Sequence, residues 1–239
     1  MCPDSPTDPS DGTARRAAAR RAAALVEPGM TLGLGSGRAV LATIEALRSH
    51  LGDAITTVTA VCASPGTERA AEQAGIAPVP LTASTDLALV IDGADELTTG
   101  LDLLKGGGGA LLRERLVITA ARRFVVVVEA PKLVARLGET RRLPIEVVRF
   151  GTQATARRLS LLVGDPRLRL EDDGNPWITD EGHLLLDAEI PADASLALLH
   201  TQLLTTPGVV DHGLFLGLAD EALVGRDDGT VTSLVAGRS

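Results

Sequence analysis

The segment "MTLGLGSGRAVLATIEALRSHL", which runs from Met30 to Leu51, decides the fold of this chain. It opens with a short apolar run, continues with three glycines in five positions, and ends with apolar residues at helical spacing. A strand, a glycine-rich turn and a helix in this order make up the first half of a βαβ unit. The segment therefore predicts an α/β protein with a buried parallel sheet.

The same alternation continues on both sides of this segment. The run "RFVVVVEA" is apolar through its centre, as expected of a strand that a parallel sheet buries on both faces. We expect strands at residues 55–64, 77–81, 87–92 and 123–130, and helices at residues 13–26, 65–75 and 110–121. This order predicts a doubly wound, mostly parallel, Rossmann-like sheet.

A second pattern begins after residue 143. We expect a strand at 145–150, a helix at 152–163, strands at 167–172 and 183–190, a helix at 193–205, a strand at 208–216, and a final hairpin at 222–235 with "DDG" as its turn. The order β-α-β-β-α-β is that of a small ferredoxin-like α+β domain. The predicted organisation is a Rossmann-like catalytic domain of residues 1–143 and 218–239, a ferredoxin-like domain of residues 144–217 inserted near the C-terminus, and a disordered tail at 1–12.

Composition narrows the class of function. The chain has 239 residues, 45% of them hydrophobic, which is enough for a sizeable core. Its net charge of −8 disfavours nucleic acid and anionic membranes as partners. Two cysteines allow no disulfide framework, no apolar run is long enough for a membrane span, and the first residues lack the order of a signal peptide. We therefore expect a cytoplasmic protein.

The turn "GLGSG", Gly33 to Gly37, is the first candidate site. Glycines between a strand and a helix let backbone N–H groups approach an anion at the helix N-terminus. Val40 stands where a dinucleotide fingerprint has its third glycine, and no Gly-Lys-Ser/Thr follows as in a P-loop. A tight turn without a ligand would have the same sequence.

The motif "DGADE" is the second candidate. Asp92 and Asp95 fall at the end of the expected strand 87–92, and the carboxyl ends of parallel strands are where such sheets place their ligands. Carboxylates crowded there suit proton transfer because their pKa values are perturbed. They would also suit Mg²⁺ or the cap of a helix.

The run "KGGGGALLRE" is the third candidate. Four successive glycines indicate a need for bare backbone, and Lys105 beside them can neutralise a phosphate or a developing oxyanion. Glu114, two turns into the following helix, can reach the same cleft. A flexible loop and an exposed ion pair are the simpler alternative. The four histidines share no metal-ligand spacing, and Cys62 has the setting of a small buried hydrophobe.

Taken in order, "LGLGSG", "VCASPGTERAAEQAGI", "IDGADE", "KGGGGALLRE", "EAPKLVARLG", "LPIEVVRF" and "PGVVDHGLF" resemble the type A ribose-5-phosphate isomerase family over almost the whole chain. The resemblance implies interconversion of D-ribose 5-phosphate and D-ribulose 5-phosphate through an enediolate, without cofactor or metal, by a homo-oligomer (dimer or tetramer). It implies that Glu114 is the base and that Asp92, Asp95 and Lys105 assist ring opening and stabilise charge. The substrate would be bound by Ser36, Gly37, Arg38, Ala39, Gly93, Ala94, Gly106, Gly107, Gly108 and Lys132.

The chain departs from the family pattern mainly where the phosphate should bind. The family turn G-T-G-S-T is replaced by Gly35-Ser36-Gly37-Arg38-Ala39, so that a hydroxyl is lost at Ala39 and a cation is gained at Arg38. Glu129 and Pro131 replace an aspartate and a serine before Lys132, and Arg115 replaces the lysine of the family's REK. These changes predict a retained reaction with an altered substrate-binding set.

Three other functions remain open from the sequence. A non-catalytic sugar-phosphate sensor would share the scaffold, but the sequence has no helix-turn-helix pattern and retains both Lys105 and Glu114. A relative of acyl-CoA transferases would use a glutamate as nucleophile, although those enzymes are longer and place that residue differently. A metal-dependent enzyme is the least favoured alternative.

Overall fold

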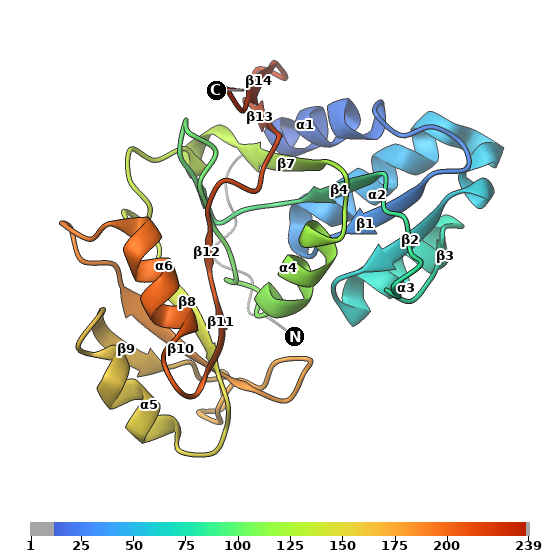
Figure 1. Ribbon diagram of the computed structural model, residues 1–239. Helices are drawn as coiled ribbons and strands as arrows, with labels where there is room; N and C mark the ends of the chain where they lie inside the picture. Colours follow the sequence, from blue (N-terminus) through green and yellow to red (C-terminus); the bar gives the residue numbers. More distant parts are fainter. Residues whose placement is uncertain (1–11, 238–239) are drawn as a thin grey trace.

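The computed structural model describes residues 12–237, and its larger part is a seven-stranded sheet in the order β14-β13-β7-β4-β1-β2-β3 (Figure 1). Every neighbouring pair is parallel except β13 and β14, which form the expected C-terminal hairpin. The strands are β1 (Thr31–Leu34), β2 (Thr59–Cys62), β3 (Ala77–Pro78), β4 (Leu89–Asp92), β7 (Phe124–Glu129), β13 (Glu221–Gly225) and β14 (Val231–Val235).

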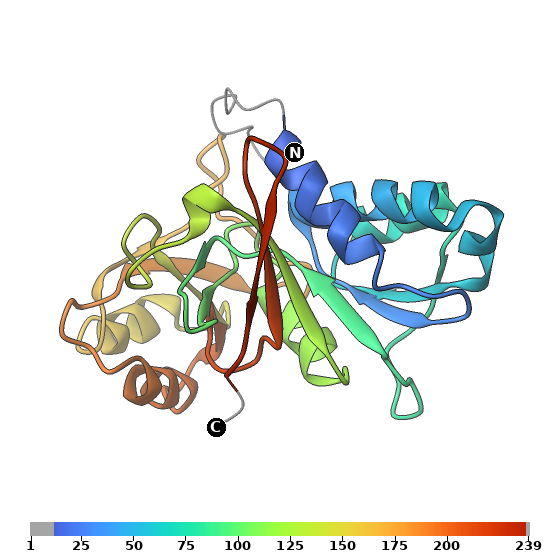
Figure 2. The same cartoon turned by 90° about the horizontal axis from the view of Figure 1, so that it is seen from above.

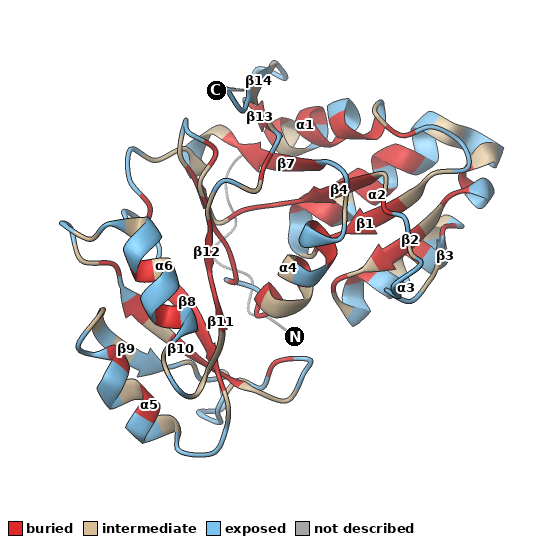
Figure 3. Cartoon of the chain, viewed as in Figure 1, coloured by how far each residue is buried: buried red, intermediate tan, exposed pale blue. Residues whose placement is uncertain are grey.

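Helices cover both faces of this sheet, as the view from above shows (Figure 2). One face carries α1 (Thr13–Ala23), α2 (Gly37–Leu51) and α3 (Pro65–Ala74), and the other carries α4 (Leu111–Thr119). The strand β7 is buried at every position because its valines alternate between the two cores (Figure 3). The doubly wound, mostly parallel sheet expected from the sequence is confirmed.

The ferredoxin-like order is also confirmed. Strands β8 (Leu143–Val147), β9 (Gly164–Leu168), β10 (Leu184–Glu189) and β11 (Val209–His212) form a separate antiparallel sheet in the order β11-β8-β10-β9. Helices α5 (Thr152–Leu159) and α6 (Leu196–Leu204) pack on one face of this sheet through a shared aliphatic core. The opposite face of β10 carries Leu185 and Asp187, and Leu185 joins the core that contains α4.

A third, three-stranded sheet was not expected. It consists of β5 (Glu96–Leu97), β6 (Leu103–Leu104) and β12 (Leu214–Phe215) in the order β12-β6-β5. The single strand expected at 208–216 is therefore wrong, because the chain breaks at Gly213 into β11 and β12. A Cβ at Gly213 would lie 2.3 Å from the Lys105 carbonyl oxygen, so only glycine permits this crossing. The domain limits at 143/144 and 217/218 stay a prediction.

Other differences concern the ends of elements. Residues 52–57 form a 3-10 helix (η1, Gly52–Thr57), so the strand expected at 55–64 begins only at Thr59. The strand expected at 77–81 is reduced to two residues because Pro78 and Pro80 lack N–H donors, as befits an edge strand. The strand expected at 167–172 lies earlier, at Gly164–Leu168, on the exposed edge of the small sheet. Residues 1–11 of the expected disordered tail lie outside the described residues. Within the described part of the chain, no helix has the length and apolar character needed to cross a membrane.

Candidate active site

A cavity of about 910 Å³ opens at the carboxyl ends of β1, β4 and β7. One wall of the cavity consists of the turn before α2, the segment after β4 and the loop after β6. The other wall consists of residues of β10 in the small antiparallel sheet and of the connection from β9 to β10. This is the edge at which doubly wound sheets bind ligands. Every site residue expected from the sequence except Asp92 lines the cavity, and Asp92 lies directly beneath it.

Asp92 is fully buried at the end of β4 and is held by three donors. Its Oδ1 accepts from the backbone N–H of Gly93 at 2.7 Å and of Ser36 at 3.1 Å, and its Oδ2 lies 2.8 Å from Lys105 Nζ. The turn approaches so closely that a Cβ at Gly35 would lie 1.8 Å from Asp92 Cγ. Burial raises the pKa of Asp92 to about 7, and the Glu114 carboxylate acts in the same direction.

Lys105 is the cation of the cluster and is only 3% exposed. Its Nζ lies between Asp92 and Glu114, 3.2 Å from Glu114 Oε2, and donates to the Gly93 carbonyl oxygen at 2.7 Å. Burial alone would lower the pKa of Lys105, but the two carboxylates outweigh it and raise the pKa. A charged ammonium therefore stays at the floor of the cavity across the physiological pH range.

Glu114 lies in the first turn of α4, not two turns into the helix as expected from the sequence, and is 4% exposed. Ser36 Oγ donates to its Oε1 at 2.6 Å, while Lys105 holds the other oxygen. Asp92 and Glu114 thus flank one ammonium, 2.8 Å and 3.2 Å from Lys105 Nζ, and the Glu114 charge disfavours ionisation of the Asp92 carboxyl. Such a cluster can accept a proton and return it.

Asp95 and Lys132 lie apart from this cluster. The Asp95 carboxylate accepts from the Gly107 backbone N–H at 2.7 Å, and so it holds the glycine loop, which we define as Lys105 to Gly109. Lys132 Nζ donates to the Ala94 carbonyl oxygen at 2.5 Å. Burial lowers the pKa of Lys132. The sequence analysis placed Asp95 in one acidic cluster with Asp92, but in the structure the Asp95 carboxylate binds the backbone of the glycine loop.

The turn before α2 presents a cationic wall. Ser36 is the extended N-cap of α2, Gly37 and Arg38 are exposed, and Ala39 is buried against the sheet. Arg15, Arg69 and Lys132 line the same cavity, and Arg15 Nε lies 2.6 Å from Glu129 Oε1. A helix N-terminus surrounded by cations favours a bound anion.

Several cavity residues were missed by the sequence analysis. Arg169, Trp177 and Asp187 reach the cavity from the small domain, and Arg15 and Arg69 reach it from α1 and α3. None lies within a glycine-rich or acidic motif, so their position depends on how the two sheets face each other. The only feature of the sequence that could have predicted these cavity residues is the arginines themselves, since isolated cations in a chain of net charge −8 can indicate an anion-binding site.

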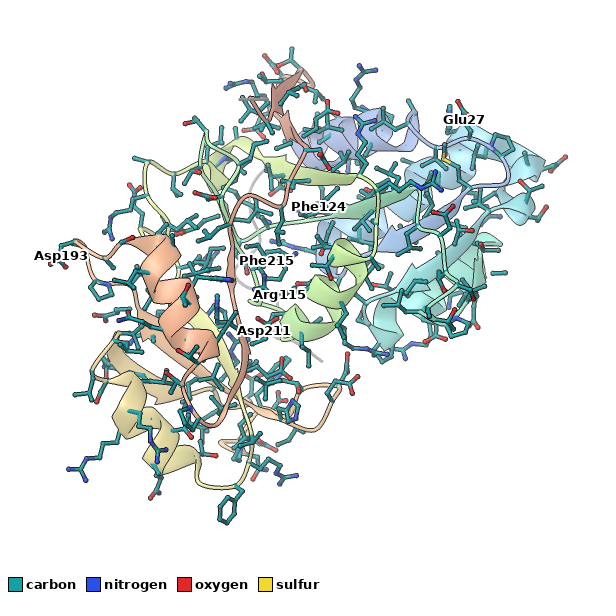
Figure 4. The ribbon with its side chains drawn as sticks, in the orientation of Figure 1. Glu27, Arg115, Phe124, Asp193, Asp211 and Phe215 are labelled. Carbon is teal, nitrogen blue, oxygen red and sulfur yellow. The ribbon has the colours of Figure 1, made fainter. Side chains whose placement is uncertain are left out.

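Arg115, which replaces the family's lysine, is structural. It pairs with Asp211 through Nε at 2.7 Å, donates to the carbonyl oxygens of His212 and Leu214, and stacks over Phe215 at 3.9 Å (Figure 4). It thereby ties α4, which carries Glu114, to the segment of β11 and β12.

The remaining titratable candidates are packed side chains. His212 is fully buried, and its pKa is lowered to about 3, chiefly by burial and by the nearby Arg115 charge. Burial raises the pKa of Cys62 to about 12, so the thiol stays protonated and is a poor nucleophile. Among residues 12–237, no group of three or more His, Cys, Asp or Glu side chains has the geometry of a metal site.

The fold and the cluster of Asp92, Lys105 and Glu114 define the class of protein as an α/β enzyme that moves a proton on a small anionic substrate. Comparison with known proteins identifies the family within this class. The chain belongs to the ribose 5-phosphate isomerase A (phosphoriboisomerase A) family, whose model matches residues 59–229.

Relatives and solved structures are similar over nearly the full chain. A ribose-5-phosphate isomerase A of Roseiflexus sp. (strain RS-1) is 44% identical over 222 residues, covering 92% of this chain and 95% of the relative. The ribose 5-phosphate isomerase A structure from Methanocaldococcus jannaschii has a TM-score of 0.87 and 35% identity, covering 95% of this chain and 100% of that one. A D-ribose-5-phosphate isomerase in complex with phospho-erythronic acid has a TM-score of 0.86 and 31% identity, covering 92% and 97%.

Proposed function

We propose that this chain is an aldose–ketose isomerase that interconverts D-ribose 5-phosphate and D-ribulose 5-phosphate through an enediolate. The observation that carries the proposal is the buried cluster in which Ser36 and Lys105 hold the Glu114 carboxylate. Isomerisation of an aldose requires a positioned carboxylate for the proton next to the carbonyl and a cation for the oxygen charge that develops. Membership of the family and the phosphorylated sugar acid bound by a similar protein support it.

The reaction assigns one role to each member of the cluster. Glu114 takes the proton from C2 of the open-chain aldose, and the electron pair of that C–H bond forms the C1–C2 double bond of the enediolate. Glu114 then delivers the proton to C1, while the proton on O2 passes to O1 and leaves a carbonyl at C2. Lys105 stabilises the enediolate charge, and Asp92 holds Lys105 in place. Asp92 and Asp95 together with Lys105 assist opening of the sugar ring.

The phosphate belongs at the cationic turn. The backbone N–H groups of Gly37, Arg38 and Ala39 at the start of α2, together with the Lys132 ammonium, form the anion site. The exposed Arg38 guanidinium supplies a charge where the family has a hydroxyl, which offsets the loss at Ala39. The carbon chain of the sugar then lies against Gly93, Ala94 and the glycines at 106–108, because these residues line the same cavity as the turn and Lys105.

The proposal includes a homo-oligomer, dimer or tetramer, in the cytoplasm, with a small sugar phosphate as partner and neither nucleic acid nor membrane. The net charge of −8 supports the last point. Light scattering on the purified chain measures the oligomeric state, and a monomer mass throughout the working concentration range would contradict the oligomer.

The direct test is conversion of ribose 5-phosphate by the purified chain in EDTA, followed by the appearance of the ketose. We expect turnover in EDTA, with arabinose 5-phosphate and glucose 6-phosphate converted far more slowly. Binding of ribose 5-phosphate without turnover would favour the sensor, and activity that depends on added metal would contradict the mechanism. Formation of a covalent glutamyl thioester with an acyl-CoA would indicate a transferase.

A further inference from the structure

An ion pair from the small domain holds the glycine loop from the side opposite Asp95. Arg169 follows β9 and Asp187 lies in β10. Arg169 Nε donates to Asp187 Oδ2 at 2.8 Å, and Nη2 donates to Oδ1, so the guanidinium meets the carboxylate at two points. Their side chains are 14% and 23% exposed, which makes the pair one of the better shielded in the small domain.

The third nitrogen of Arg169 reaches into the loop. Nη1 donates to the carbonyl oxygens of Gly106 and Gly107, each at 3.0 Å. The peptide between these two glycines is thus held at both ends, because its N–H donates to Asp95 and its carbonyl accepts from Arg169. One cation of the small domain and one carboxylate of the large sheet fix the same peptide plane.

The contact also sets the direction of the next peptide. In a trans peptide the C=O and N–H bonds point in opposite directions. Because the Gly107 carbonyl points to Arg169, the Gly108 N–H points away from Arg169. Gly108 lies on the side of Ser36, since a Cβ at Gly108 would come 3.9 Å from Ser36 Oγ, the group that holds Glu114. The contact with Arg169 therefore sets the orientation of the loop peptides on the side of the site where the sugar would bind.

We propose that Arg169, fixed by Asp187, is a positioning residue for the isomerisation, acting by orienting the Gly106–Gly108 peptides and the Asp95 carboxylate toward the substrate. The proposal rests on the function proposed above. The geometry requires an arginine, because its planar fork serves a carboxylate and two carbonyls at once, whereas the lysine ammonium is a single point charge. It gives the small domain a role in catalysis without any contact between Arg169 and the reacting carbons.

The test compares steady-state kinetics of the full chain with Arg169→Met and Asp187→Asn. A matched control is Arg113→Met, because Arg113 also pairs across the two parts of the molecule, with Asp180 at 3.6 Å and Glu181 at 3.4 Å, and both of these partners lie outside the glycine loop. We expect kcat to fall about 10- to 100-fold for Arg169→Met, as misplacement of catalytic groups does, with a much smaller change in KM. Asp187→Asn, which keeps the shape of the side chain, should give a smaller loss of the same kind, and the control should stay at the wild-type rate.

A second readout is amide hydrogen exchange of the loop. We expect the Gly107 and Gly108 amides to exchange faster in Arg169→Met than in wild type, and to be unchanged in Arg113→Met. An increase in KM with unchanged kcat would overturn the proposal by showing that Arg169 binds substrate, and a lower melting temperature with wild-type kcat would assign it to the scaffold. An inactive wild type would refute the proposed function instead, and the exchange rates would still decide whether Arg169 fixes the loop.

Discussion

Substitution of Gly35 by alanine tests whether the turn before α2 and Asp92 fit as closely as the structure shows. A Cβ at Gly35 would lie 1.8 Å from Asp92 Cγ, 1.9 Å from Oδ1 and 2.2 Å from Oδ2. Carbon atoms in contact lie about 3.5 Å apart, so the carboxylate would have to withdraw by about 1.7 Å. That movement breaks the 2.8 Å contact with Lys105 at the centre of the cluster.

The magnitude follows from the broken pair. Disrupting a buried ion pair costs about 3–5 kcal/mol, so Gly35→Ala should lower the free energy of unfolding by about that amount. The matched control is Gly37→Ala in the same turn. Gly37 has φ +81°, and no atom lies within 4 Å of the position that a Cβ would take there, so alanine should cost only about 1–2 kcal/mol of backbone strain.

Urea unfolding of both variants measures these energies, and a double-mutant cycle with Asp92→Ala isolates the cause. Once the Asp92 carboxylate is absent, Gly35→Ala should cost little, which gives a coupling energy of at least about 2 kcal/mol. Equal losses for Gly35→Ala and Gly37→Ala, or additivity with Asp92→Ala, would refute the reasoning.

Three further predictions follow from charges and packing. Because burial and the Glu114 carboxylate raise the pKa of Asp92 to about 7, kcat/KM should fall below about pH 7 as Asp92 takes up a proton. Asp92→Asn should move this acid limb to lower pH, and an unmoved limb would assign it to the substrate phosphate. The folded pKa of His212, lowered from 6.5 to about 3, means that the unfolded chain binds the extra proton, so stability is lost as pH falls from 6.5 toward 3. His212→Asn should reduce the loss of unfolding free energy between pH 6 and pH 4 by about 2–3 kcal/mol, and a pH dependence equal to that of wild type would contradict this. Trp177 is the only tryptophan; it lines the cavity and lies against the glycine loop, with Nε1 2.7 Å from the Cβ position of Gly109. Ribose 5-phosphate, unlike ribose, should therefore change the fluorescence of Glu114→Gln, and identical responses to both sugars would contradict phosphate-dependent binding in the cavity.

The large sheet could be predicted because each strand carries its own signal. The run of valines makes both faces of β7 apolar, and the glycine-rich turn at 33–37 separates β1 from α2. The two-residue strands β5, β6 and β12 carry no such signal. They form because β12 crosses to β6 at Gly213, a contact between segments about a hundred residues apart that local patterns do not encode.

The candidate site divides in the same way. Asp92, Lys105 and Glu114 could be predicted because adjacent motifs place them after one strand and at the start of one helix. The function of Asp95 as the partner of the Gly107 amide, and the hold of Arg169 on the glycine loop, could not. Both depend on where a loop lies against a second sheet, and Arg169 is more than 60 positions from the glycines that it contacts.

The most direct test of the central claim is the turnover of ribose 5-phosphate by Glu114→Gln. The amide keeps an oxygen that can accept from Ser36 but cannot take a proton from C2. Glu146→Gln is the matched control, because Glu146 is also a buried glutamate, 1% exposed, but lies in the small domain and binds Thr179 and His183. We predict that kcat falls by about 10²–10⁴-fold for Glu114→Gln in a folded protein, as for loss of a general base, and is retained in Glu146→Gln. A Glu114→Gln enzyme that turns over at the wild-type rate would contradict the account.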